Sequence, residues 1–358
     1  MVTFIVVLFS PLLLLGLEIL ENDSEYTHRV RHIALFAIVI KGFPARLIDT
    51  LRCNKDGERL RLDGPDRDAN SIIEGKVSCA KCGAAYKIQD GILEMFEDDA
   101  QLDERSKFEM ATRDVEADKR EDPNDLMGAL SEIDGMEVPT TLGQLGNPDG
   151  KAVLEIGCGT GRYTRALAES CGSLLAVDFS RKSLLVNAES MPANRTVGFV
   201  RADAGHLKLK EESFDLALST VYSNLPSPEI RSRSTESVSQ ALKVNGRYVV
   251  STHHHDIREI IRGISAAGEY DNGIFFQKFT KSSLRAELER YFSKIEMKTA
   301  CIWVPYISRL KTARVPASKL SESVPILNRL GALLLATAVK DRSSLRPHFH
   351  PRGRTWLK

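Results

Sequence analysis

Short apolar runs alternate with segments of helical periodicity between residues 151 and 340, and this alternation predicts the fold. The first run, Ala152–Ile156, leads into glycines and then into a helical pattern over residues 163–169. A strand, a tight turn and a helix in this order form the first unit of a parallel α/β sheet. Further apolar runs predict strands at residues 173–178, 197–201, 213–220, 241–251, 295–304 and 331–340, the last as an antiparallel edge strand.

Three glycines, Gly157, Gly159 and Gly161, follow the first predicted strand. Because glycine has no Cβ, the backbone of such a turn can approach a ligand closely. The dinucleotide fingerprint Gly-x-Gly-x-x-Gly would place its third glycine at Arg162, one residue later than it occurs here. The spacing therefore argues against a nicotinamide dinucleotide as the ligand.

The segment Glu155-Ile-Gly-Cys-Gly-Thr-Gly161 resembles motif I of the class I S-adenosylmethionine (SAM)-dependent methyltransferases, in which an acidic residue precedes a glycine loop. Residues 202–204 resemble the adenine-contacting motif of that family, and residues 213–220 resemble its fourth-strand motif. Residues 241–251 resemble the turn into the fifth strand, with Asn-Gly in place of the usual Gly-Gly. The resemblance covers about residues 104–340 and implies a Rossmann-like sheet of seven strands.

The same resemblance implies SAM as the cofactor. Glu155 and the glycine turn would hold the methionyl end, and Asp203 with Ala204 the adenine. Asp178 ends a predicted strand where α/β nucleotide sites place a carboxylate for the ribose hydroxyls. The expected cofactor-binding residues are Glu155, Gly157, Gly159, Gly161, Asp178, Phe179, Asp203, Ala204 and Thr220.

Candidate catalytic residues are harder to choose, because in methyl transfer the cofactor carries the reactive group and the protein chiefly binds and aligns. Residues 219–224 and 252–256 follow strand ends and should border the methyl group. Tyr222 and His253 are the catalytic candidates, since a histidine there could take a proton from the acceptor near neutral pH. The alternative is that His253 and its two neighbouring histidines are packing or surface residues. His206 is equally ambiguous.

Two cysteine-containing turns precede this domain, and they predict a small β-rich module over residues 48–98. Cys53 and Asp56 form the first ligand pair, and Cys79 and Cys82 form the second. Pairs of this form about 20 residues apart are typical of a zinc ribbon, although Asp56 stands where a cysteine is expected. The module resembles the zinc ribbons fused to or partnering with methyltransferases, including the activator of tRNA methyltransferases. The alternative is a ribbon that keeps its fold without zinc, with buried cysteines.

The remaining segments lie at the ends of the chain and between the modules. Residues 1–47 form an apolar N-terminal extension in which residues 2–20 are either a membrane anchor or a buried or dispensable segment. Residues 99–150 form an acidic linker with a helix at 103–118, whose Phe108, Ala111 and Val115 are available for one face. Residues 151–340 form the methyltransferase-like domain, in which the insertion 305–329 is expected to cover the acceptor. The tail 341–358 is basic.

Composition narrows the functional alternatives. The length of 358 residues suits a full α/β domain and a smaller one, and the net charge of +1 argues against a whole-molecule polyanion binder. Scattered cysteines suit a reducing, cytoplasmic location, with membrane association if the N-terminal segment is an anchor and the catalytic domain then cytoplasmic.

The sequence therefore predicts a SAM-dependent methyltransferase. Its acceptor is either a small molecule, which the apolar N-terminus favours, or RNA, which the zinc-ribbon resemblance favours. RNA binding would weaken steeply with rising salt, whereas binding of a lipophilic small molecule would not. The competing interpretation is a catalytically inactive binding partner or scaffold with the methyltransferase fold.

Overall fold

The computed structural model describes residues 42–64, 71–96, 102–118, 127–192, 195–220, 222–302, 320–321, 324 and 327–341, with the side chains of 127–134 and 328 left aside. The predicted anchor 2–20, most of the insertion 305–329 and nearly all of the tail 341–358 lie outside these residues. Within the described part of the chain, no helix is long and apolar enough to span a membrane.

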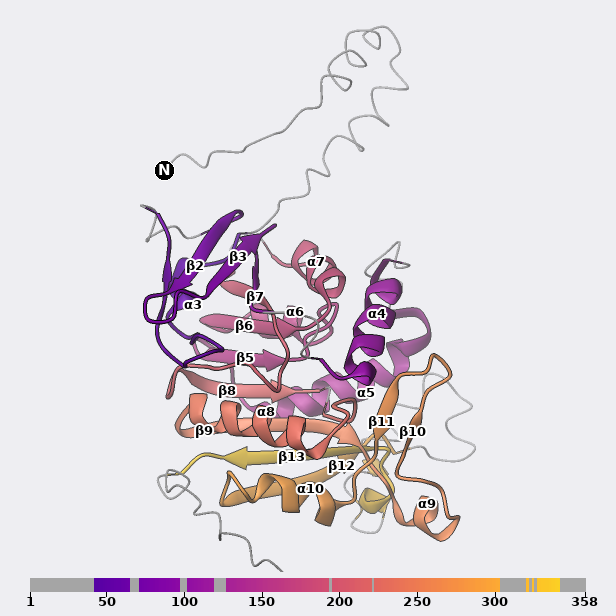
Figure 1. The fold of residues 1–358 in the computed structure, drawn as a ribbon. Helices are drawn as coiled ribbons and strands as arrows, with labels where there is room; N and C mark the ends of the chain where they lie inside the picture. The colour runs from indigo at the N-terminus through magenta and orange to yellow at the C-terminus, as the bar shows by residue number, and fades with distance from the viewer. Residues whose placement is uncertain are drawn as a thin grey trace, which may run out of the picture. The chain divides into compact units, whose positions relative to one another are not determined.

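The centre of the fold is a parallel sheet that runs in the order β7-β6-β5-β8-β9 (Figure 1). Two antiparallel strands, β13 and β12, complete it on the β9 side. This order confirms the predicted Rossmann-like α/β fold. The seven strands are β5 (Ala152–Ile156), β6 (Ser173–Asp178), β7 (Val197–Arg201), β8 (Phe214–Ser219), β9 (Leu242–His253), β12 (Lys294–Ala300) and β13 (Leu333–Val339).

The last strand is not the edge strand that the sequence predicted. β13 is antiparallel as expected, but it lies between β9 and β12, so that β12 forms the edge. Burial explains the arrangement: residues 333–338 are all buried, as a strand covered on both faces requires, whereas β12 leaves Lys294 and Glu296 exposed. The continuous apolar run of 333–338 was therefore a signal of an interior position.

The N-terminal segment adds four strands to the same sheet, which therefore has eleven strands rather than seven. Strands β1 (Leu60–Leu62), β2 (Gly75–Cys79) and β3 (Ala85–Gln89) are antiparallel, and β4 (Ile92–Glu94) pairs in parallel with β7. The junction is closely packed. A Cβ at Gly198 in β7 would lie 2.8 Å from Leu47 Cδ1 and 3.0 Å from Phe43 Cε2.

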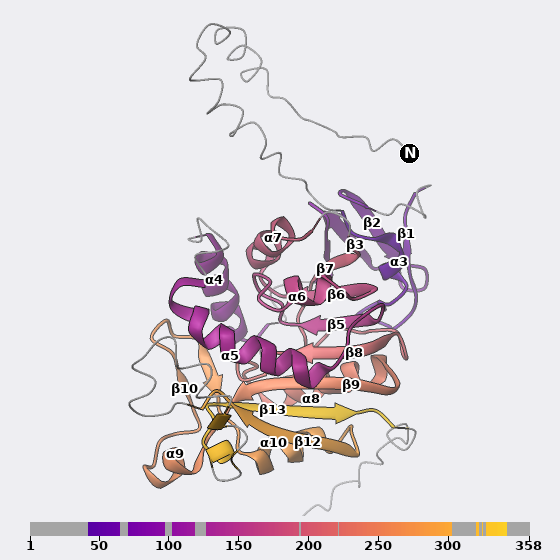
Figure 2. The same cartoon turned by 180° about the vertical axis from the view of Figure 1, so that it is seen from behind.

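Helices cover both faces of the sheet. α8 (Pro228–Ala241) and α10 (Lys281–Leu288) lie on the face turned to the viewer in Figure 1, and the short α3 (Ala45–Ile48) shares their hydrophobic core. The opposite face, seen in Figure 2, carries α5 (Met127–Leu145), α6 (Thr164–Ala168) and α7 (Arg181–Glu189).

Local sequence signals fix where these helices begin. Ser227 caps α8 by accepting a hydrogen bond from the Ile230 N–H, and Pro228 occupies the first turn, where a missing N–H costs nothing. Ser180 caps α7, and Thr280 and Ser283 form a reciprocal capping box at α10. Each helix thereby starts directly after a loop at one end of the sheet.

The predicted helix in the acidic linker is present as α4 (Glu104–Asp118), but its inward face is not the one predicted. Phe108 and Val115 are each 51% exposed. The inward face instead carries Ser106, Glu109 and Arg113, at spacings of three and four residues. The polar face turns inward because it lines a cavity rather than the hydrophobic core.

A hairpin outside the main sheet faces α4. Its strands, β10 (Ala267–Glu269) and β11 (Phe275–Gln277), pair antiparallel. The Asn272 amide donates a hydrogen bond of 2.9 Å to Glu116 of α4, and the Arg105 guanidinium lies 4.9 Å from the centre of the Phe275 ring. These contacts join α4 to the hairpin.

Candidate functional site

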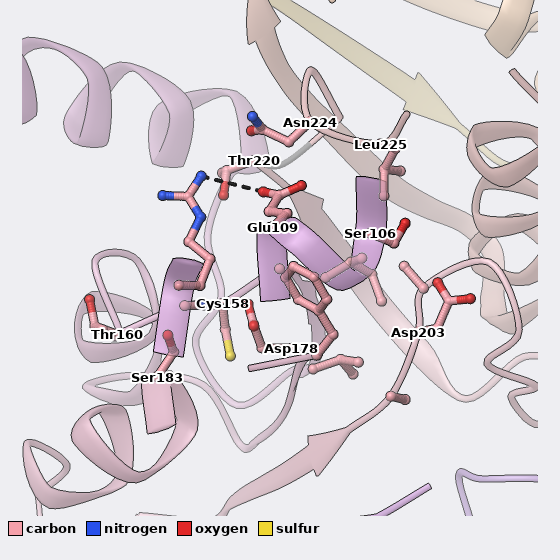
Figure 3. A pocket seen from close by; sticks show the side chains of 18 of the residues that line it. Ser106, Glu109, Cys158, Thr160, Asp178, Ser183, Asp203, Thr220, Asn224 and Leu225 are labelled. Atoms are coloured by element: carbon pink, nitrogen blue, oxygen red, sulfur yellow. Dashed lines mark hydrogen bonds and ion pairs between the residues drawn. The ribbon is translucent and has the colours of Figure 1, made fainter. Parts of the chain in front are cut away.

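A cavity of about 300 Å³ lies at the carboxyl ends of β5, β6, β7 and β8. Its walls are residues 156–160 and 162–163, 177–179, 202–204 and 224–226, together with the inward face of α4 (Figure 3). The strand order reverses between β5 and β8, and open α/β sheets bind ligands in the crevice at such a reversal. The fold therefore places the cavity at the expected binding position.

The turn after β5 depends on its three glycines. Gly157, Gly159 and Gly161 have φ angles of 73°, 50° and 97°, a region that side chains with a Cβ rarely adopt. The N–H groups of Gly157 and Cys158 both donate to the Val177 carbonyl, at 2.8 and 3.0 Å. These bonds hold the turn against the end of β6.

Asp178 connects the turn to the next helix. Its carboxylate accepts a 2.8 Å hydrogen bond from the Gly159 N–H and a 2.9 Å bond from the Ser180 N–H. Burial raises the pKa of Asp178, and these backbone donors act in the opposite direction. Each carboxylate oxygen can accept more than one hydrogen bond, so Asp178 retains acceptor capacity toward the cavity that it lines.

Seven of the nine predicted cofactor-binding residues line this cavity, and two do not. Glu155 is 1% exposed and lies behind the turn, where its Oε2 accepts a hydrogen bond of 2.8 Å from the Thr164 hydroxyl. Burial raises the pKa of Glu155 to about 8. Gly161 likewise lies outside the lining, against Asn187, whose amide donates to the Gly159 carbonyl. The lining residues are Gly157, Gly159, Asp178, Phe179, Asp203, Ala204 and Thr220.

Asp203 lies at the opposite wall from the glycine turn (Figure 3). One of its oxygens accepts a 2.9 Å hydrogen bond from the Gly205 N–H, and the other pairs with Nδ1 of His206. This contact gives the ambiguous His206 a partner, so that its role is to hold the Asp203 carboxylate in place.

Three charged residues of α4, Glu109, Arg113 and Glu116, line the cavity, and none of them was predicted from the sequence. Glu109 is 8% exposed, and burial raises its pKa to about 7. Arg113 pairs with Glu109 at 3.4 Å and with Glu116 at 3.1 Å. Figure 3 draws the ion pair of Glu109 as a dashed line. Charged residues on a predicted helix ordinarily face solvent. The sequence alone therefore did not indicate that these residues line a cavity.

Tyr222 is the clearest correction among the predicted site residues. Its side chain is 1% exposed and does not line the cavity. The hydroxyl donates a 2.9 Å hydrogen bond to Glu287 of α10, which also pairs with the buried Arg231 of α8. Tyr222 therefore joins α8 and α10 on one face of the sheet, and its hydroxyl bonds these helices rather than facing the cavity.

His253, the other catalytic candidate, lies beside the hairpin. Its Nε2 is 2.5 Å from the hydroxyl of Tyr270, at the end of β10. Burial raises the pKa of Tyr270, and a hydrogen bond with Asn224 acts in the opposite direction. Neither His253 nor Tyr270 lines the cavity, but the pair lies next to its β8 side, because Tyr270 is hydrogen-bonded to Asn224, which does line it. Of the other two histidines, His254 bonds the Gly331 carbonyl and His255 the Ile264 carbonyl.

The four predicted metal ligands gather at one point. One ligand atom from each of Cys53, Asp56, Cys79 and Cys82 lies within 4.8 Å of the others. The Sγ atoms of Cys53 and Cys82 are 3.5 Å apart, and Cys79 Sγ is 3.5 Å from both Asp56 oxygens. Three sulfurs and a carboxylate at such spacings fit a tetrahedral zinc ion.

The two turns that carry these ligands have the same conformation. Gly57 N–H donates to the Cys53 carbonyl at 2.8 Å, and Gly83 N–H donates to the Cys79 carbonyl at 3.1 Å. Both glycines have positive φ, 78° and 74°. The sequence pairs Cys53 with Asp56 and Cys79 with Cys82 therefore form equivalent turns.

The known proteins to which this chain is similar are methyltransferases. Residues 153–246 match the family model described as a methyltransferase domain. Phosphoethanolamine N-methyltransferase 1 of Arabidopsis thaliana is 37% identical over 91 residues, which are 25% of this chain and 18% of that protein. Demethylmenaquinone methyltransferase of Clavibacter sepedonicus is 32% identical over 102 residues, 28% of this chain and 40% of that protein.

A solved structure, phosphoethanolamine N-methyltransferase 1 of Haemonchus contortus in complex with phosphoethanolamine and S-adenosylhomocysteine, aligns with a TM-score of 0.47 and 18% identity. The alignment covers 69% of this chain and 52% of that one. The matched stretches span less than half of the two curated relatives. The family match and the strand order identify a class I SAM-dependent methyltransferase domain in this chain, as the glycine turn predicted.

Proposed function

We propose that this chain binds SAM in the cavity and transfers its methyl group to a small-molecule acceptor. The main support for the proposal is the hydrogen bond that the Gly159 N–H donates to Asp178. It connects the glycine turn to the end of β6, beside the point where the strand order reverses. Bound there, SAM supplies the reactive methyl group. The protein's part is to hold the cofactor, align the acceptor and exclude water.

The covered shape of the cavity supports a small acceptor. α4 lies over one side, and Asn272 of the hairpin bonds Glu116 of α4 beside it. The curated relatives are named for phosphoethanolamine and demethylmenaquinone, both small molecules. We therefore favour a small molecule over RNA, and activity that falls steeply with rising salt would reverse that preference.

The first test is cofactor binding. Asp178→Ala is expected to weaken SAM binding by about 1.5–3 kcal/mol, because charge-assisted hydrogen bonds to the ribose and the anchor of the Gly159 N–H are both lost. Calorimetry with SAM measures the change. The matched control is Asp215→Ala, since Asp215 lies at the amino end of β8 and pairs with Lys243. Equal affinities in the two variants would remove Asp178 from the site.

Activity separates an enzyme from an inactive scaffold of the same fold. Methyl-labelled SAM is incubated with the small-molecule and RNA fractions of a cell extract. Label transferred to the small-molecule fraction supports the proposal. Tight SAM binding with no transfer to either fraction would favour the scaffold.

We propose that His253 takes the proton of the methyl acceptor at Nδ1, while its Nε2–H donates to the Tyr270 hydroxyl through the 2.5 Å contact, which orients the ring. His253→Asn is expected to lower the rate of label transfer by about 100-fold while SAM affinity stays unchanged, because a general base contributes about 10²–10⁴ to rate. Tyr270→Phe is expected to have a smaller effect. The control is His255→Asn, because the His255 ring contacts only the Ile264 carbonyl among the bonds observed in the described structure.

If His253→Asn and His255→Asn lower the rate equally, the proton has another acceptor. Glu109 would then be the next candidate, because it lines the cavity with a pKa raised to about 7. In that case activity should rise with pH through about 7 in the parent enzyme and lose this dependence in Glu109→Gln.

We also propose that Cys53, Asp56, Cys79 and Cys82 hold one structural zinc ion. The 4.8 Å cluster and the matched pair of glycine turns support this assignment. All four ligands come from the protein, as in structural rather than catalytic zinc sites. Metal analysis of protein expressed with zinc tests the assignment, with about one zinc per chain expected.

A further inference from the structure

Four isoleucines form an exposed surface on α9 (Ile257–Ile261) and the turn that follows it. Ile257, Ile260 and Ile261 stand at positions i, i+3 and i+4 of the helix, which share one side, and Ile264 follows the positive-φ Gly263 in the turn that ends it. Their exposed fractions are 53%, 46%, 78% and 42%. A single exposed isoleucine is ordinary, but four together form a contiguous apolar patch of the kind that marks interaction sites. We call these four residues the isoleucine face.

The polar residues of α9 fix this orientation. Asp256 is 5% exposed and caps the helix by accepting hydrogen bonds from the N–H groups of Arg258 and Glu259. Glu259 forms an ion pair with Lys278 at 2.5 Å. The polar side of the helix is therefore held against the protein. The apolar side therefore faces outward, whereas the apolar side of an ordinary surface helix faces the core.

Positive charge borders the isoleucine face. Arg262 lies within it in sequence and is exposed, and Arg258 donates a 2.8 Å hydrogen bond to the Leu330 carbonyl, which brings η3 (Leu327–Arg329) beside α9. Burial and the charge of Arg329 lower the pKa of Lys281, so these two cations are also neighbours. Within the part of the chain that the structure describes, no acidic group forms an ion pair with Arg262, Lys281 or Arg329.

We propose that the isoleucine face docks on the surface of an anionic phospholipid bilayer, with its isoleucines in the acyl boundary and the bordering cations against the headgroups. An apolar side flanked by Lys and Arg is the pattern of helices that lie in a membrane interface. The acids of α9 are already neutralised by Arg258 and Lys278, so that they do not oppose an anionic surface.

The place of the isoleucine face in the chain determines what docking would do to the cavity. β10 begins at Ala267, shortly after the isoleucine face, and runs alongside β11 (Figure 1). Tyr270 follows β10 and contacts His253 next to the β8 side of the cavity. Docking would bring that side of the cavity near the lipid surface, where an acceptor with a lipid tail resides. This consequence rests on the proposed methyl transfer, whereas docking itself does not.

A local probe is needed, because residues 2–20 are apolar and would themselves hold the full chain to vesicles. In Ile261→Trp, the fluorescence that exceeds that of the parent chain comes from the new tryptophan. This difference therefore reports on the isoleucine face alone. With phosphatidylcholine vesicles containing phosphatidylserine, the added emission is expected to shift to shorter wavelength and to be quenched by brominated lipid. Ile73→Trp, at an exposed isoleucine of the N-terminal segment, is the matched control.

Docking also predicts that the quenching depends on the apolar side chains of the isoleucine face and on the charge of the lipid. The quenching in Ile261→Trp is expected to weaken about tenfold or more in Ile257→Asp, and to fall as salt is raised because screening removes the headgroup attraction. SAM affinity by calorimetry is expected to stay unchanged in Ile257→Asp, which separates this proposal from the proposed function.

Three results would overturn the proposal. They are no change of the Ile261→Trp emission with anionic vesicles, equal quenching in Ile73→Trp, or an emission shift without lipid that follows dimerisation in light scattering. The last result would assign the isoleucine face to contact with a second copy of the chain.

Discussion

Gly161→Ala is expected to abolish measurable SAM binding and to destabilise the fold, although Gly161 does not line the cavity. A Cβ at this position would lie 2.8 Å from Cγ of Asn187, and the φ of 97° is unfavourable for alanine. Asn187 is fully buried and cannot move aside without losing its bonds to the Gly159 carbonyl and to the Thr164 hydroxyl. The displaced loop no longer presents the Gly159 N–H to Asp178.

We expect SAM affinity to fall by at least about 100-fold and the free energy of unfolding by about 2–4 kcal/mol, from backbone strain together with overpacking. Calorimetry and denaturant titration measure the two quantities. Gly150→Ala is the matched control, because Gly150 also has a positive φ of 67° but has open space where its Cβ would stand. That variant should cost about 1 kcal/mol and leave SAM affinity unchanged. Parent-like SAM binding in Gly161→Ala would show that the clash is relieved without moving the turn.

Loss of zinc is expected to unfold the N-terminal four strands while the central sheet keeps its structure. Cys79→Ser is expected to reduce zinc from about one per chain to near zero, because a site with three sulfurs loses one thiolate and a binding free energy of about 10–16 kcal/mol is available to such sites. Strands β1, β2 and β3 contain only 13 residues in total, and the cluster joins the turn before β1 to the turn after β2.

Hydrogen exchange locates the effect. Amides of residues 75–94 should lose protection in Cys79→Ser and after chelation, whereas those of β5 and β8 should not. The control is Cys171→Ser, a half-buried cysteine of the catalytic region that lies far from the cluster in sequence. Unchanged protection of 75–94 in zinc-free protein would support the alternative stated at the outset, a ribbon that keeps its fold without metal.

These two predictions concern the glycine turn and the cysteine turns, both of which could be predicted from the sequence. The glycine turn, the acid at the end of β6 and the positions of the parallel strands along the chain could be predicted, because each depends on local periodicity and on residues adjacent in the chain. The two cysteine turns were equally local, since Cys53, Asp56, Cys79 and Cys82 occupy identical positions relative to Gly57 and Gly83.

Other features depend on long-range packing that periodicity does not encode. An apolar run such as 333–338 indicates a buried strand but does not name its neighbours, and only pairing with both β9 and β12 decided that β13 is interior. Similarly, nothing in residues 92–94 distinguishes a separate module from a strand that pairs with β7.

The site shows the same division. The sequence by itself determined the glycine turn, the two acids Asp178 and Asp203 that line the cavity and the four residues of the cysteine cluster, because residue type and spacing along the chain specify each of them. Only the tertiary structure decided that Tyr222 is turned toward Glu287, that Glu109 of α4 enters the cavity and that Tyr270 reaches His253. In each case the direction of a side chain depends on which distant element packs beside it, and the cost of burying a polar group without a partner selects that direction.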